Sequence, residues 1–166
     1  MFASIAEFNA EWSHESASTQ KVLDALTDAS LKQQVTPEGR TLGRLAWHVV
    51  TSIPGMLDHF GLTVAKVEGE DVVPATARQI AETHRQVSAA AAEAVKRQWT
   101  DESLTETQNV FGRDMTRAAM LSLMIKHIIH HRGQMTVLMR QAGLEVPGVY
   151  GPTREDWSRM GVAAPK

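Results

Sequence analysis

Histidines are the residues of this sequence whose type and spacing could do chemistry. Two of them, His127 and His131, lie four residues apart in the segment MLSLMIKHIIHHRGQMTVLM. Side chains at this spacing lie one turn apart on a helix, near enough to bind a single ion. The flanking apolar residues recur on the same side, so both histidines project from the face that turns inward. The pair predicts either a metal site or two hydrogen-bonded histidines in the core.

A third ligand could come from the segment LGRLAWHVVTSIPGMLDHF, which is also helical in its periodicity. His48 lies on the shoulder of its apolar face, where a side chain can reach a neighbouring helix. His59 lies on a similar line, three turns further along. Periodicity alone does not separate these two residues.

The remaining histidines have weaker signals. His130 lies about 60° round the helix from His127, on the side away from His131. We expect it to contact a substrate or to be a polar residue at the helix flank. His14 and His84 have polar neighbours in the sequence and are predicted to lie on the surface.

Three neutral imidazoles suit zinc or nickel, with iron as a further candidate, and catalytic sites of this kind keep a coordination position open. Ile128 stands where a zinc metalloprotease would carry its glutamate base, which argues against that class. A base from the first helix, such as Glu11 or Glu15, is conceivable, but no catalytic residue can be assigned. The chain has no cysteine, so any thiol in the reaction has to arrive on another molecule.

The elements that position these histidines are predicted to be helices separated by Gly, Pro, Ser and Thr. The four expected helices cover about residues 3–26, 42–60, 76–99 and 117–142. Thr41 and Thr116 are suited to cap the second and fourth helices, and Gly61 and Gly143 to end them.

The segment of residues 62–74 has no clear periodicity and is long enough to cross a bundle. Residues 106–115 read as irregular structure. We therefore predict an all-α fold, a four-helix bundle with a long crossover connection between the second and third helices, in one domain covering residues 1–166.

The fourth helix has three further features. Gly133 in its middle is explained either by close approach of another segment or as a tolerated exception, and Arg132 is expected to pair with Glu155 or Asp156 in the tail. A second apolar face is either enclosed by neighbouring helices or part of a subunit contact, so we expect a homodimer. This face consists of Leu121, Ile125, Ile128 and Ile129.

The bulk composition excludes several classes of protein. Of the 166 residues 43% are apolar and 22% charged, with a formal net charge of −2. This balance gives no sequence-wide attraction for nucleic acid, so no nucleic-acid partner is expected. The N-terminal residues lack a basic start, and no apolar run approaches the ~20 residues of a membrane span. We expect no membrane association and a cytoplasmic location.

Three segments together resemble the DinB-like proteins, the bacterial damage-inducible family also grouped with YfiT. They are LGRLAWH, KHIIHHRGQM and VPGVYGPTREDW. The resemblance covers most of the chain and implies a four-helix bundle with a crossover connection, often dimeric. It also implies a metal site with one histidine from the second helix and a pair from the fourth. Carried onto this sequence, the ligands are His48, His127 and His131, and His48 is chosen over His59.

The resemblance implies metal-dependent chemistry on a small molecule. The wider group includes hydrolases and S-transferases that use a low-molecular-weight thiol, and membership does not choose between them. Ile128 departs from members with an acidic residue at this position, which puts a local carboxylate base in doubt. A non-catalytic, metal-bound module of the stress response is the alternative. The DNA polymerase that shares the family name is unrelated.

Overall fold

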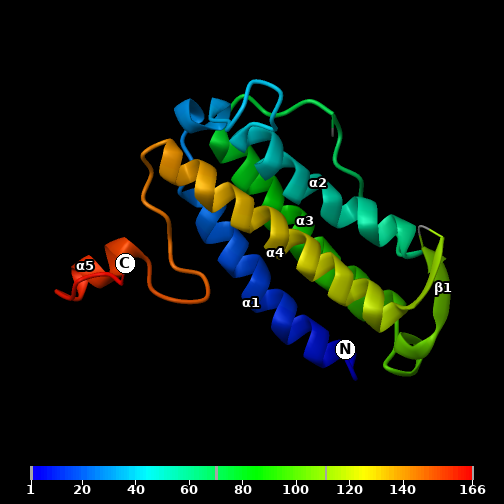
Figure 1. Cartoon of the computed structure of the whole chain (residues 1–166). Coiled ribbons are helices and arrows are strands. Elements are labelled where there is room, and N and C mark those ends of the chain that lie inside the picture. Colours follow the sequence, from blue (N-terminus) through cyan, green and yellow to red (C-terminus); the bar gives the residue numbers. More distant parts are fainter. Residues whose placement is uncertain (1, 70, 111, 166) are drawn as a thin grey trace.

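The computed structural model describes residues 2–69, 71–110 and 112–165 and shows a bundle of four long helices (Figure 1). The long helices are α1 (Ile5–Asp24), α2 (Leu42–His59), α3 (Ala77–Gln98) and α4 (Arg117–Gln141). Shorter helical segments are η1 (Asp28–Lys32), η2 (Glu102–Thr105) and α5 (Arg154–Arg159). The predicted all-α four-helix bundle is confirmed.

The helices begin and end where short-range chemistry predicts. The Thr41 and Thr116 side chains accept hydrogen bonds from backbone N–H groups in the first turns of α2 and α4. These bonds satisfy donors that lack partners inside the helix. Gly61 and Gly143 follow the two helices with φ of +81° and +77°, which glycine adopts without steric cost.

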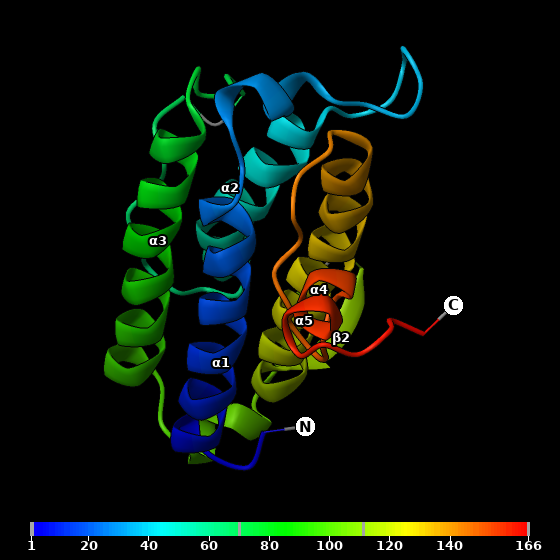
Figure 2. The same ribbon diagram turned by 90° about the vertical axis from the view of Figure 1, so that its left-hand side faces the viewer.

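The helices lie around a shared apolar core in the order α1, α3, α2, α4. Thus α1 packs against α3 and α4, and α2 packs against the same two helices (Figure 2). The core consists of side chains from all four helices, with Phe8, Ile53, Ile80 and Met124 among the fully buried ones.

The connection between α2 and α3 crosses the length of the bundle, as predicted. At one end the Ala77 N–H donates to the Asp28 carboxylate, which places the start of α3 beside η1. At the other end Thr63 exchanges two hydrogen bonds with the Gln98 side chain, so α2 and α3 finish close together. Therefore α2 and α3 run parallel, and both are antiparallel to α1 and α4.

One local prediction is wrong. Residues 106–115, expected to be irregular, contain most of a small antiparallel hairpin of β1 (Thr107–Val110) and β2 (Arg113–Thr116). The strands are short and Val110 is their one buried residue, so they lack the apolar alternation by which strands are recognised. The hairpin is held instead by pairing between the two strands and by a side-chain hydrogen bond from Asn109 to Asp114, and the sequence pattern shows neither.

The second apolar face of α4 is enclosed within the bundle. Leu121, Ile125 and Ile128 are buried, and Ile129 packs against the core. This face therefore gives no argument for a subunit contact, and the homodimer stays a prediction. None of the helices in the described ranges is both long and apolar enough to cross a membrane.

Candidate metal centre

The fourth helix presents two histidines to α2. His127 and His131 lie one turn apart on α4, and their ring centroids are 4.5 Å apart with the planes nearly perpendicular. His131 is 8% exposed and His127 is half-buried. The long α4 fixes both backbones, because α4 packs against α1 and α2 along its length.

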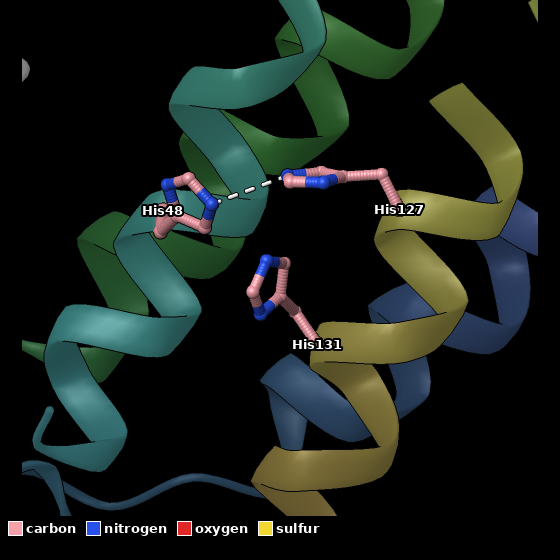
Figure 3. Close-up of side chains that lie close together, drawn as sticks. All are labelled: His48, His127 and His131. Carbon is pink, nitrogen blue, oxygen red and sulfur yellow. Dashed lines mark hydrogen bonds between the residues drawn. The ribbon is translucent and has the colours of Figure 1, made fainter. Parts of the chain in front are cut away.

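The third histidine comes from the facing helix. His48 lies on α2 with its Nε2 3.1 Å from Nε2 of His127, and its ring centroid 4.6 Å from that of His131. Figure 3 shows the three rings turned toward a common point between α2 and α4. One nitrogen from each ring can be chosen so that all three lie within 4.8 Å of one another.

This arrangement fits a divalent metal. Two nitrogens that each lie about 2.0–2.1 Å from one ion are roughly 2.9–3.4 Å apart for coordination angles between octahedral and tetrahedral. The separation between His48 and His127 falls in this range. The three donors are all imidazole nitrogens, the ligand type that suits zinc, nickel and iron. The residues present therefore could hold such an ion.

Gln134 determines which nitrogen of His131 is free. Its Oε1 lies 2.7 Å from His131 Nδ1, a distance at which the imidazole N–H donates to the amide oxygen. The proton is then on Nδ1, and Nε2 keeps a lone pair for a metal. The Gln134 amide nitrogen lies 3.3 Å from His130 Nε2, so the same side chain joins His130 to this arrangement. His130 itself is exposed and outside the cluster.

The environment keeps the three imidazoles neutral near pH 7. Burial, followed by the charges of His131 and His127, lowers the pKa of His48 to about 4. Burial is also the main cause of the lowered pKa of His127 and of His131, with the Gln134 hydrogen bond opposing the shift in His131. A neutral imidazole is the form that binds metal.

A cavity opens beside the cluster. Its volume is about 480 Å³, and it shares His131 and Gln134 with the site. The other side chains around it are Val35, Arg40, Leu45, Val137 and Leu138, with Gly39 at the loop. The described lining contains no carboxylate. A small molecule in this cavity would contact His131 directly.

The other histidines lie elsewhere, as far as the described residues show. His59 is exposed at the end of α2, where its backbone carbonyl accepts from Gln108, so the choice of His48 agrees with the geometry. His14 is exposed, as predicted. His84, predicted to lie on the surface, is only 1% exposed and this prediction is wrong.

His84 is a satisfied core histidine. Its Nδ1 lies 2.7 Å from Gln20 Oε1 on α1, and its Nε2 lies 3.1 Å from Ser88 Oγ. Burial lowers its pKa to about 4. The sequence did hold a signal, because His84 falls at helical spacing between the buried residues Ile80 and Val87.

Arg132 points away from the three histidines, as expected, but its partner is different. Its Nη2 lies 2.7 Å from Glu15 Oε2 on α1, and its Nη1 donates to Thr19 and to the Glu15 carbonyl. The Tyr150 hydroxyl donates to the other Glu15 oxygen, at 2.7 Å. Glu155 instead pairs with Arg140.

Two further expectations concern this region. Glu15 is held by Arg132 on the side of α4 that faces α1, and Glu11 is exposed, so neither carboxylate joins the described histidine cluster. Gly133 has no atom of another segment within 4 Å of where a Cβ would lie, so of its two explanations close approach does not apply.

Comparison with known proteins places the chain in a family. The sequence model of the DinB family matches residues 1–165. The uncharacterized protein YrdA of Bacillus subtilis strain 168 is 46% identical over 166 residues, covering 100% of this chain and 99% of YrdA.

Two solved structures of DinB-like proteins are similar to this chain. A DinB-like protein from Bacillus cereus ATCC 10987 has 49% sequence identity and a TM-score of 0.86, covering 90% of this chain and 100% of that one. YjoA, a DinB-like protein from Bacillus subtilis, shares the fold at 16% identity and a TM-score of 0.65, covering 86% of this chain and 97% of its own. The chain therefore belongs to the DinB family.

Proposed function

We propose that this protein is a metal-dependent enzyme that uses zinc or nickel, held by His48, His127 and His131, to act on a small molecule. The observation that carries the proposal is the convergence of three imidazole nitrogens, one pair of them 3.1 Å apart, beside a cavity of about 480 Å³. A divalent ion lowers the pKa of a coordinated water or thiol and so supplies a nucleophile near neutral pH.

The side chains around the cluster have complementary roles. Gln134 orients His131, and the buried surroundings on α2 and α4 keep the imidazoles neutral. The apolar side chains Leu45 and Leu138 would exclude water from part of a bound substrate. These roles suit a binding cavity for a substrate more than a closed structural metal site.

The cavity favours thiol transfer over hydrolysis. Its described lining offers no carboxylate to take a proton, as a hydrolase of the metalloprotease type requires. A thiol with a pKa of about 8.5 needs a far smaller shift than water to ionise at pH 7. In such a transfer the sulfur forms a bond to an electrophilic carbon, the leaving group departs with its electron pair, and the thiol proton passes to solvent.

Metal content is the first test. Mass spectrometry of untagged protein is expected to find near-stoichiometric zinc or nickel, lost in His48→Ala and in His131→Ala but retained in His14→Ala, a control at an exposed histidine. Protein that stays metal-free after incubation with zinc, nickel and iron would overturn the proposal.

The metal-loaded protein then distinguishes the reactions. It is screened with low-molecular-weight thiols plus an aromatic electrophile, and separately with hydrolysable esters. Thiol-dependent turnover that requires His131 supports transfer, and ester hydrolysis without thiol supports the hydrolase. Bound metal with neither activity favours a non-catalytic stress-response module.

A further inference from the structure

Arg40 belongs to a loop whose shape is fixed at its base. The Leu42 N–H donates to the Gln33 carbonyl at 2.7 Å, and the Gly39 N–H donates to the Thr36 carbonyl at 2.9 Å. These two bonds close the loop before α2, and Arg40 directly precedes Thr41, which caps this helix. The loop thereby places Arg40 at the cavity that His131 and Gln134 line from α4.

The cavity beside the histidines has one positive end and apolar walls. Arg40 and Gly39 line it from the loop, and His131 and Gln134 line it from α4. The walls between are aliphatic, formed by Val35, Leu45, Val137 and Leu138. Val35 and Val137 are 67% and 56% exposed, so the apolar side chains of these two residues are open to solvent.

Among the described residues, 2–69, 71–110 and 112–165, no ion pair neutralises the charge of Arg40. No Asp or Glu of this part of the chain lines the cavity.

From these observations we propose that Arg40 binds a carboxylate of the substrate, and that the substrate class is a small organic acid with a short apolar chain between carboxylate and reacting atom. The proposal deepens the proposed function and rests on it for the reacting end. A single planar guanidinium matches one carboxylate through paired hydrogen bonds. A phosphate dianion would need further donors, and the described lining supplies no second cation. The aliphatic walls match the chain between the two ends of the molecule.

The carboxylate could belong to the thiol or to its electrophilic partner, and two probe pairs separate these sources. Linear mercaptohexanoate and mercaptohexanol differ only at the end opposite the sulfur, where one has a charged carboxylate and the other a neutral hydroxymethyl group. Linear chlorohexanoate and chlorohexanol are the equivalent pair for the electrophile. Binding of each compound to zinc-loaded protein is measured by titration calorimetry.

Arg40→Gln is expected to weaken binding of the carboxylate member of at least one pair about fivefold, as for an ion pair open to solvent. Binding of the neutral members should stay unchanged, and Arg40→Lys should recover part of the loss. Arg78→Gln on α3, whose side chain is 86% exposed, is the matched control and should bind all four compounds like the wild type. The pair that responds identifies which reactant carries the carboxylate.

Equal binding of the charged and neutral members, unaffected by Arg40→Gln while zinc remains bound, would overturn the inference and leave the metal site standing. If the protein holds no metal, chlorohexanoate is titrated into the metal-free form. If Arg40→Gln weakens chlorohexanoate binding to the metal-free protein, the anion site stands although the proposed metal-dependent function does not. If binding is unchanged, both proposals are overturned.

Discussion

Two polar clusters lie on the sides of α4 that face α2 and α1, and they differ in how their groups are satisfied. On the α1 side, Arg132 is 2% exposed and its guanidinium is bonded to Glu15, Thr19 and Tyr150. On the α2 side, the rings of His127 and His131 face His48. Among the described residues, His127 is hydrogen-bonded to His48, and His131 to Gln134.

The difference separates a structural polar group from a candidate ligand. A buried charge costs several kcal/mol unless its hydrogen bonds are completed, and Arg132 has them completed within the chain. His84 is a second satisfied case, with a partner on each ring nitrogen. Three neutral imidazoles whose nitrogens converge have lone pairs that a single ion would satisfy together, and the next experiments test this distinction.

The largest expected effect is a loss of stability in the Arg132 cluster, on the side of α4 that faces α1. Glu15→Ala removes the carboxylate that holds Arg132 and Tyr150, leaving a buried guanidinium without its counter-charge. We expect the free energy of unfolding to fall by about 3–5 kcal/mol, measured by urea denaturation. Metal affinity of the folded protein should be unchanged, because Glu15 is not part of the cluster.

Glu11→Ala is the control for this prediction, since Glu11 lies one turn earlier on α1 and is exposed. Its stability should stay within about 0.5 kcal/mol of the wild type. If Glu15→Ala leaves stability unchanged but abolishes metal binding or turnover, Glu15 belongs to the functional site, and the Arg132 cluster is not a separate structural cluster.

The second effect concerns pH and separates His84 from the cluster. The pKa of His84 is 6.5 in its ordinary state and about 4 in the folded protein. Between these values the unfolded chain binds a proton that the folded protein does not, so stability falls as pH falls from 6.5 and the loss is complete near pH 4. The full loss from this one residue is about 3 kcal/mol.

Metal-free wild type and His84→Gln, unfolded in urea at several pH values, measure this contribution. The three clustered histidines titrate in both proteins, so their contribution cancels in the difference. The difference in unfolding free energy should change by about 3 kcal/mol between pH 7 and pH 4. Parallel curves would show that His84 keeps its ordinary pKa in the fold.

The sequence predicted the elements better than the partners. Helix bounds followed from local signals, such as the Thr41 and Thr116 caps, and the inward pair on α4 followed from a four-residue spacing. Periodicity could not choose between His48 and His59, because both lie on similar lines of α2. Only the family resemblance chose His48, and the structure places its Nε2 3.1 Å from that of His127.

The residues whose surroundings were predicted wrongly make contacts with residues distant in the sequence. Arg132 pairs with Glu15, which lies 117 positions away, although nearer acids in the tail were available. His84 is bonded to Gln20 on α1, 64 positions away, and no pattern within α3 shows that bond. The β1–β2 hairpin was missed for the opposite reason, since four-residue strands carry too little local pattern.

The smallest expected effect concerns the hydrogen bond between Gln134 and His131 at the candidate metal site. Gln134→Leu removes the acceptor that keeps the proton of His131 on Nδ1, so the ring can rotate or place its proton on Nε2. Loss of such an orienting partner weakens metal binding by about 10- to 100-fold, and we expect the lower figure because Gln134 is exposed. Zinc affinity is measured by competition with a chromophoric chelator. Gln134→Glu keeps an acceptor and should retain affinity, and Gln141→Leu, at the exposed end of α4, should bind zinc like the wild type. If Gln134→Leu binds zinc like the wild type, packing alone orients His131. The histidine cluster would then be held rigidly within the chain, as Arg132 is on the other side of α4.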